Sequence, residues 1–341
     1  MFLHDNGYIE IEDTDLKTLN ILFGGRGIGK TYSILKHRIQ NALNDPNQKF
    51  IWLRDSNEVC KKIVAGNSLA TPICLNEPNM PKITIEKFEG SFTFVAHLSD
   101  GIMKPIGYLM ALSTFHNARG INYDDVSCIV WDEFIPEEGT LVKKNQGAIF
   151  LNAYESVNRN REFDGLKPVQ IIFLSNTNDI YSDVLADLGV NEIIESMAYN
   201  KESVFVNADM WIKFLSSEAF YEKKKDTFIY RIANNDKFKN MALDNKFNNN
   251  LALVKRDLKL KNATGLLTVD GRYTLIQLED NTLYFKLGCW KDLINYDMEN
   301  DQEAILFRLL FSDKLRLKYI AGEMFFDSIY TQRKILDYAR M

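Results

Sequence analysis

The chain has 341 residues, a formal net charge of −5, 46% hydrophobic residues and 26% charged residues. This composition excludes an intrinsically disordered chain, and the length predicts two domains. No apolar run is long enough to cross a bilayer and no signal-peptide pattern is present, so we expect an intracellular protein without a membrane partner. The four cysteines form no C-x-x-C pair, and neither a disulfide framework nor a zinc site is predicted.

The first strong signal is a glycine-rich loop between a predicted strand at residues 19–23 and a predicted helix at residues 32–43. It fits the phosphate-binding pattern G-x-x-x-x-G-K-[ST] at every fixed position, with the residues Gly24, Gly25, Arg26, Gly27, Ile28, Gly29, Lys30 and Thr31. Backbone N–H groups and the helix dipole hold phosphates in such a loop. We therefore expect ATP to bind here, with Lys30 at its β- and γ-phosphates and Thr31 as a ligand of Mg²⁺.

Further apolar runs predict strands at residues 49–54, 91–96, 107–112, 127–131 and 169–174, with a helix at 146–158 between the last two. Strands that alternate with helices form a mostly parallel sheet that is covered on both faces. Residues 1–200 therefore read as one α/β domain.

An acidic pair follows the strand at residues 127–131. Asp132 is suited to the Mg²⁺ shell, and Glu133 is suited to orient and polarise the attacking water. Acidic pairs also occur in ordinary turns, but the phosphate loop upstream favours a catalytic role. This second carboxylate predicts a P-loop NTPase of the additional-strand catalytic-glutamate type.

Polar residues at other strand ends are further candidates. Asn176, after the strand at 169–174, fits a sensor of the γ-phosphate, and a simple Asx turn explains it equally well. Guanidinium groups stabilise charge on a transferring phosphoryl group, often across a subunit interface. Arg54, Arg119 and Arg159 are the candidates, and a surface ion pair is the alternative for each.

The remainder of the chain differs in character. Residues 201–228 read as a charged helical linker or subdomain. Residues 229–341 predict a small α+β domain, with an antiparallel meander at 265–269, 273–278 and 283–287 and helices at 301–321 and 325–340. The first 200 residues carry an acidic excess and the rest a small basic excess, so any DNA contact must be local.

Several motifs together resemble one family. The loop at residues 24–31, Val-Trp-Asp-Glu-Phe-Ile at 130–135, Asn-Arg-Asn-Arg-Glu at 158–162, Leu-Ser-Asn at 174–176 and the segment at 241–247 are similar to the DNA-packaging ATPases of phi29-type phages. The resemblance implies a homopentameric ring, docked on a procapsid in the cytoplasm of an infected bacterial host. Such a ring pumps double-stranded DNA through a portal, with a structural RNA in some relatives.

The resemblance also implies roles for single residues. Arg159 would act on the ATP of a neighbouring subunit, and Arg161 would support the fold or the interface. Arg119 would be a second trans-acting basic group, although the family pattern has lysine there. Arg54 would couple nucleotide state to the P-loop, and Asn176 gains support as the sensor.

A C-terminal domain similar to ribonuclease-H-like nucleases is implied as well. Such nucleases need carboxylates that converge on metal ions. The strand at 264–269 has no acidic residue in its body, and turn chemistry explains Asp270 in its Asp-Gly pair. We expect no nuclease activity, and docking to DNA, a portal or another ligand fits this domain better. Lys143–Lys144 and Lys61–Lys62 are candidate DNA contacts, with solvated surface as the alternative.

Two other function classes remain open. One is a slow nucleotide-dependent regulatory switch, which has no need for Glu133 and a trans-acting Arg159. The other is a helicase or recombination ATPase, and the sequence offers neither a second motor core nor evident aromatic platforms for single strands.

Overall fold

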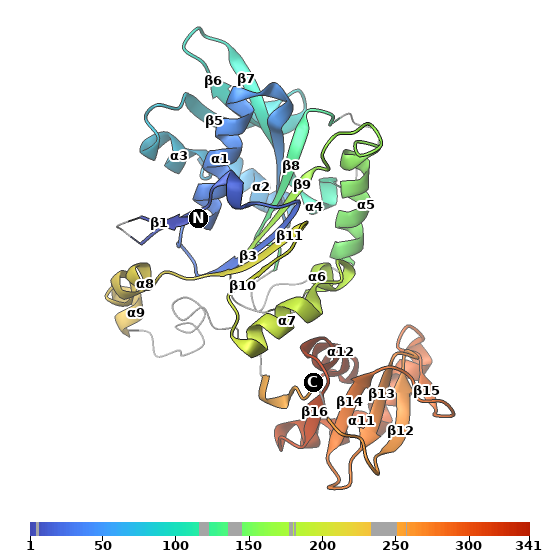
Figure 1. Cartoon of the computed structure of the whole chain (residues 1–341). Coiled ribbons are helices and arrows are strands. Elements are labelled where there is room, and N and C mark those ends of the chain that lie inside the picture. Colours follow the sequence, from blue (N-terminus) through green and yellow to red (C-terminus); the bar gives the residue numbers. More distant parts are fainter. Residues whose placement is uncertain are drawn as a thin grey trace. The chain divides into compact units, whose positions relative to one another are not determined.

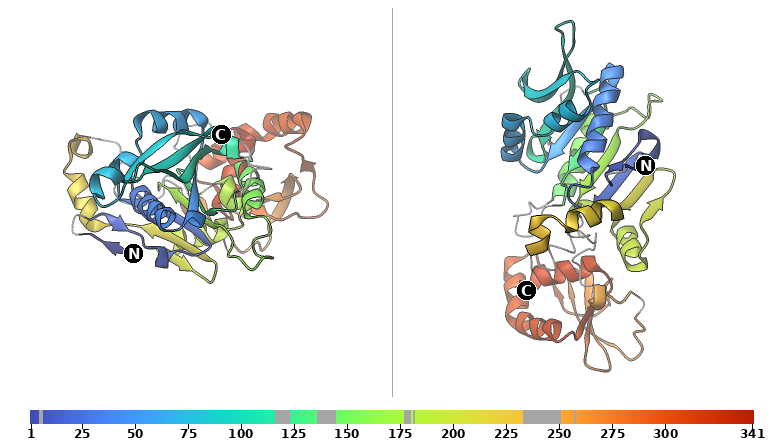
Figure 2. Two further views of the ribbon diagram at one scale, coloured as in Figure 1. Left: turned by 90° about the horizontal axis from the view of Figure 1, so that it is seen from above. Right: turned by 90° about the vertical axis from the view of Figure 1, so that its left-hand side faces the viewer.

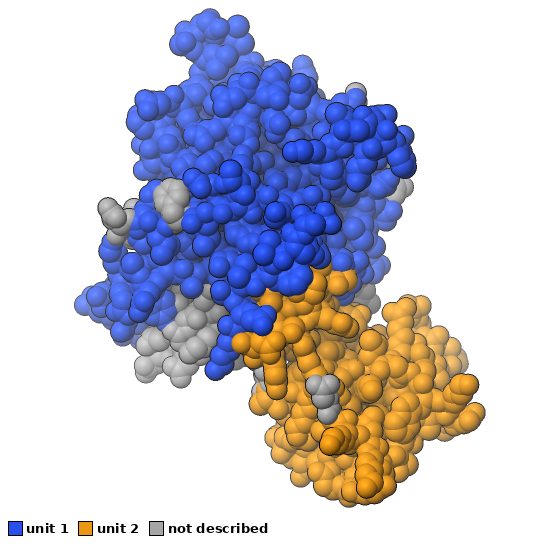
Figure 3. All heavy atoms as spheres, viewed as in Figure 1, with its two compact units in different colours: residues 1–188, 201–248 blue, residues 189–200, 249–341 orange. Residues whose placement is uncertain are grey.

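The computed structural model describes residues 1–4, 7–115, 123–135, 145–176, 180, 182–232, 251–256 and 258–341. The chain divides into two compact units (Figure 3). Unit 1 comprises residues 1–188 and 201–248, and unit 2 comprises residues 189–200 and 249–341. Each unit has its own sheet and its own hydrophobic core.

Unit 1 is built on a nine-stranded sheet (Figure 1). From β11 to β7 each strand is parallel to its neighbour, while β10, β6 and β5 pair antiparallel at the two edges. In spatial order the strands are β10 (Val204–Val206), β11 (Met210–Leu215), β3 (Leu19–Gly24), β9 (Gln170–Ser175), β8 (Val126–Asp132), β4 (Lys49–Arg54), β7 (Met103–Ala111), β6 (Ser91–His97) and β5 (Lys82–Phe88). The predicted mostly parallel sheet is confirmed.

Helices cover both faces of this sheet (Figures 1 and 2). The helices α1 (Lys30–Asn44), α2 (Asn57–Gly66) and α3 (Ala70–Asn76) lie on one face, and α5 (Gln146–Asn158) lies on the other. The shorter helices are α4 (Leu112–Phe115), α6 (Asp183–Asp187), α8 (Glu218–Lys225) and α9 (Phe228–Ile232). A two-residue pair, β1 (Phe2–Leu3) and β2 (Ile9–Glu10), precedes the first long strand.

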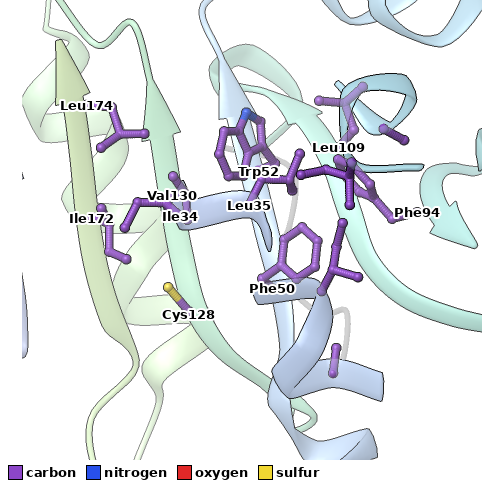
Figure 4. Packing of buried hydrophobic residues seen from close by; sticks show 14 of the residues in the cluster. Ile34, Leu35, Phe50, Trp52, Phe94, Leu109, Cys128, Val130, Ile172 and Leu174 are labelled. Carbon is purple, nitrogen blue, oxygen red and sulfur yellow. The ribbon is translucent and has the colours of Figure 1, made fainter. Parts of the chain in front are cut away.

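The central strands are rich in apolar residues because both of their faces are buried. Ile34 and Leu35 of α1 pack with Phe50 and Trp52 of β4 in one core layer (Figure 4). On the opposite face Trp131 of β8 stacks on Phe150 of α5, with ring centroids 5.5 Å apart, beside Phe173 of β9. Full burial of side chains of this size contributes about 1.5–3 kcal/mol each.

The segment expected to be a helical linker differs from its prediction. Residues 204–206 and 210–215 form β10 and β11, and β11 pairs in parallel with β3, the strand before the glycine-rich loop at residues 24–31. Helix begins only at Glu218, where Ser217 caps it. The run Lys223–Lys225 gave the whole segment a charged helical character, and the pairing partner of β11 lies about 190 residues away in the chain. A local sequence pattern could not reveal this pairing of β11 with β3.

In its described residues, unit 2 combines a five-stranded sheet with three α-helices. The strands β12 (Thr264–Val269), β13 (Tyr273–Gln277) and β14 (Leu283–Leu287) form the predicted antiparallel meander. Two short parallel strands flank it, β15 (Asn295–Tyr296) beside β12 and β16 (Met324–Phe326) beside β14. The helices are α7 (Asn191–Asn200), α11 (Asp301–Ile320) and α12 (Ile329–Ala339). The predicted last helix therefore starts later than residue 325, because 324–326 is strand and Ser328 is the N-cap.

Helix α7 belongs to unit 2 although the chain around it belongs to unit 1. Its Glu195 is buried, lies 3.4 Å from Arg256 and accepts a backbone N–H at Ile329, the first residue of α12. In the part of the chain that the structure describes, no helix has both the length and the apolar character that a membrane crossing requires.

Candidate active site

Glycine positions allow the loop at residues 24–31 to turn tightly into α1. Gly27 and Gly29 have φ angles of 79° and 107°, in the region that side chains with a Cβ rarely adopt. A Cβ on Gly29 would also lie only 3.0 Å from the carbonyl oxygen of Ile9. The loop therefore delivers Lys30 as the first residue of α1, with the helix N-terminus directed at the site.

Lys30 is buried at this position. Its Nζ donates to the carbonyl oxygens of Gly24 at 2.6 Å and Gly25 at 3.0 Å, and lies 3.4 Å from Oδ1 of Asn176. Burial lowers the pKa of the Lys30 ammonium to about 8, and the nearby Asp132 carboxylate partly opposes this change. Asn176 is thus brought to the phosphate loop, as its place after β9 predicted.

Asp132, the last residue of β8, lies beside Thr31. Oγ1 of Thr31 donates to Oδ1 of Asp132 at 3.2 Å, and Nη1 of Arg54 donates to Oδ2 at 2.6 Å. Burial raises the pKa of the Asp132 carboxyl, while the Arg54 guanidinium lowers it. A hydroxyl and a carboxylate this close are the hard oxygen ligands that Mg²⁺ prefers, so the donor set fits that cation.

Glu133 is held in a different way. Its φ angle of 57° lies in the left-handed region, and its side chain is 54% exposed. Such strain in a residue other than glycine is often found at functional sites. Nη2 of Arg54 donates to its carboxylate, so one guanidinium binds both acidic side chains of the pair.

A cavity of about 700 Å³ opens beside these residues, a volume in the usual range for small-molecule sites. The N-terminal segment contributes Tyr8, Ile9 and Glu10 to its lining, and α3 with the residue after it contributes Asn76 and Glu77. These residues were absent from the sequence prediction. They belong to no motif, and only the folded chain brings them to the loop.

Arg159 lies near the amino-terminal ends of the parallel strands, opposite the ends that carry the candidate site. It caps α5, which runs back to the starts of β8 and β9, where Oδ1 of Asn158 accepts the N–H of Val169 at 2.8 Å. Because β8 has seven residues, its amino-terminal and carboxyl-terminal ends are about 20 Å apart. Arg159 is exposed there, and Arg161 donates to the carbonyl oxygens of Asp124 and Val126, which supports the fold.

The remaining residues proposed from the sequence lie away from this cavity or outside the described residues. Arg119, Lys143–Lys144 and residues 241–247 lie outside the described residues. Lys61 and Lys62 are exposed on α2. Asp270 has a positive φ of 52° in its turn and accepts the N–H of Met298 at 2.7 Å. Within the described ranges, no three or more His, Cys, Asp or Glu side chains are grouped as metal ligands.

Comparison with known proteins gives a consistent set of matches. The family model of the podovirus DNA encapsidation protein (Gp16) matches residues 11–264. The DNA packaging protein of Bacillus phage B103 is 28% identical over 235 residues, which are 68% of this chain and 65% of that protein. The DNA packaging protein of Bacillus phage phi29 is 25% identical over 232 residues, 68% of this chain and 62% of that protein. The chain therefore matches less than two thirds of the length of these relatives.

Solved structures show the same fold. A chain of the bacteriophage Phi-29 viral genome packaging motor assembly aligns with a TM-score of 0.65 and 18% identity over 95% of each chain. A chain of the Phi-28 gp11 DNA packaging motor aligns with a TM-score of 0.59 and 18% identity over 95% of this chain and 94% of that one.

Proposed function

We propose that this chain, which belongs to the podovirus DNA encapsidation protein (Gp16) family, is the ATP-hydrolysing subunit of a motor that moves double-stranded viral DNA into a preformed procapsid. One observation carries the proposal. Lys30, the Thr31–Asp132 pair and Glu133 converge at the carboxyl-terminal ends of the central strands, beside a cavity of about 700 Å³.

The arrangement fits ATP with Mg²⁺. Lys30 and the backbone N–H groups of the loop would hold the β- and γ-phosphates, and Thr31 and Asp132 would hold the cation. The bound cation supplies charge neutralisation at the phosphates. A single strand, β9, lies between β3 and β8, and this order supports the additional-strand catalytic-glutamate class.

Glu133 is proposed to orient the attacking water and to accept its proton. In the structure its carboxylate is bound by Arg54, so it must leave that ion pair before it can act. Arg54 contacts Asp132 and Glu133 together, and this contact supports its proposed role in coupling nucleotide state to the site. Asn176, within reach of Lys30, is proposed as the γ-phosphate sensor.

Arg159 is proposed as the finger that completes a neighbour's site. Its position near the amino-terminal ends of β8 and β9, about 20 Å from the candidate site of its own subunit, supports a trans role. A trans role requires a neighbouring subunit, and a pentameric ring with a portal and procapsid as partners is proposed from the family. Arg119 is proposed as a second trans-acting group, and a structural RNA as a further component of the assembly. The motor would act in the host cytoplasm.

For unit 2 we propose a ribonuclease-H-like domain without nuclease activity that serves for docking. The antiparallel meander with a parallel fourth strand, β15, supports the fold assignment. Asp270 accepts the N–H of Met298, and among the described residues it belongs to no group of three or more His, Cys, Asp or Glu side chains.

The proposal is tested by measuring ATP hydrolysis by the assembled protein without DNA, with single-stranded DNA and with duplex DNA. Stimulation by duplex DNA alone is expected. Stimulation by single strands would favour a helicase or recombination ATPase. Slow hydrolysis that no DNA accelerates would favour the regulatory switch and would contradict translocation.

A further inference from the structure

Helix α8 is fixed to the N-terminal segment of unit 1, next to the phosphate loop (Figure 1). Oγ of Ser217 donates to the carbonyl oxygen of Gly7 at 2.6 Å and accepts the N–H of Phe220 at 3.2 Å. The rings of Tyr8 and Phe220 lie 5.3 Å apart. A Cβ on Gly7 would meet the backbone nitrogen of Phe220 at 2.4 Å, so only glycine allows this approach.

Within this helix, Lys224 reaches the phosphate loop itself. Its Nζ donates to the main-chain carbonyl oxygen of Arg26, between the rings of Phe220 and Tyr230, whose centroids are 5.4 and 5.2 Å away. Lys224 also lines a recess of about 560 Å³ that shares Tyr8, Arg26 and Gly27 with the cavity of the candidate active site. Its neighbour Lys225 is exposed and pairs with Glu222.

Three cations therefore meet at the loop: Arg26, Lys30 and Lys224. Burial lowers the pKa of the Lys224 ammonium, and the positive charge of Arg26 lowers it further. Lys224 and Arg26 likewise add to the lowered pKa of Lys30. The carboxylates of Asp132 and Glu133, which act on Lys30, are both bound to Arg54. Like charges at a partly buried loop repel each other, and an anion placed among them removes that cost.

We propose that Lys224 is a second phosphate-binding lysine of the nucleotide site, acting in cis. On binding of a nucleoside triphosphate it exchanges the neutral Arg26 carbonyl for a charged phosphate oxygen, and it thereby fixes α8 to the loaded loop. A hydrogen bond between two charged groups is about twice as strong as one to a neutral acceptor, which favours the exchange. This inference rests on the proposed nucleotide binding at residues 24–31.

The test compares the wild-type protein with Lys224→Met, Lys224→Arg and Lys225→Met. Methionine keeps a flexible apolar stem that packs well against aromatic rings, while arginine keeps the charge. Lys225→Met removes the same charge one position away from the loop. Equilibrium dissociation constants of ATP with Mg²⁺ are measured for each, together with hydrogen–deuterium exchange of the α8 amides with and without ATP.

We expect Lys224→Met to weaken ATP binding by about tenfold or more, the effect of losing one hydrogen bond to a charged group. Lys224→Arg should restore most of the affinity, and Lys225→Met should change it little. ATP should slow exchange in α8 of the wild type and of Lys224→Arg, but not of Lys224→Met.

Two outcomes would overturn the inference. Unchanged ATP affinity of Lys224→Met would show that the contact to Arg26 only packs the helix, and equal losses for methionine and arginine would show a steric role. If the wild-type protein itself binds no ATP, the proposed function fails, and that result is distinct from both.

Discussion

Removal of Arg54 is the perturbation whose effect follows most directly from the structure. Its guanidinium is the cationic partner of Asp132, whose side chain is only 6% exposed, at 2.6 Å. Breaking a buried ion pair from one side costs about 3–5 kcal/mol, because the remaining charge loses its partner. Asp132 keeps the hydroxyl of Thr31 and the nearby charge of Lys30, so the lower end of this range applies. The second partner, Glu133, is half exposed and adds little. We therefore expect Arg54→Met to destabilise nucleotide-free unit 1 by about 3 kcal/mol at neutral pH.

For a unit of this size, a loss of about 3 kcal/mol lowers Tm by roughly 6–12 °C. The two units need separate probes, since a chain with two cores does not unfold in a two-state transition. In a Trp290→Phe background the remaining tryptophans are Trp52, Trp131 and Trp211, all in unit 1. Their fluorescence during thermal or urea unfolding then reports on unit 1 alone.

The control is the double variant Arg54→Met with Asp132→Asn, which removes both charges and should recover most of the stability. Burial raises the pKa of Asp132, and loss of Arg54 raises it further. The folded variant therefore takes up a proton before the unfolded chain does, and its deficit should shrink as pH falls from neutral toward 3.8, the ordinary value for aspartate. A double variant as unstable as the single one, or a deficit independent of pH, would refute the reasoning.

Three further predictions concern Glu133, Lys30 and Glu195. Glu133→Gln should bind ATP as the wild type does but turn over about 10²–10⁴-fold more slowly, as measured by phosphate release and equilibrium binding. The pKa of Lys30 in the free protein is about 8 and bound phosphates favour its charged form, so ATP affinity should be full below pH 8 and fall as pH rises above it. Isothermal titrations between pH 7 and 9.5 check this, and Lys30→Arg should show a weaker decline, because Lys224 is then the remaining phosphate-binding lysine with a lowered pKa. Glu195→Ala leaves the N–H of Ile329 without its acceptor and should destabilise unit 2 by about 1–3 kcal/mol, measured by hydrogen–deuterium exchange of the unit 2 amides, while Glu195→Gln should lose less.

Much of unit 1 was predictable because its central strands are buried on both faces. Residues 21–23, 128–131 and 171–174 are uninterrupted apolar runs, and a candidate site residue lies within two positions after each one. The phosphate loop is fixed by local chemistry, since its glycines adopt backbone angles that other residues avoid. Such features are encoded within a few residues and survive any rearrangement of the rest of the sheet.

Contacts between segments that are distant in the sequence could not be predicted from local sequence patterns. The position of Arg54 at a strand end was visible, but its ion pairs depend on β4 lying beside β8, and strand order in a parallel sheet does not follow the sequence. Tyr8 and Glu10 reach the cavity from a segment without any motif. Lys224 stands in a run of three lysines that is typical of a solvated helix end, and only the docking of α8 reveals its contact with the phosphate loop.

The central claim is a motor whose ATP site is completed by the neighbouring subunit. It is tested most directly by mixing Arg159→Ala subunits with Glu133→Gln subunits and measuring ATP hydrolysis in the presence of duplex DNA. Each variant alone should be nearly inactive. In mixed rings, intact sites of the first variant meet intact arginines of the second, so hydrolysis should exceed that of either variant alone. Mixtures that stay as inactive as their components would contradict a shared site.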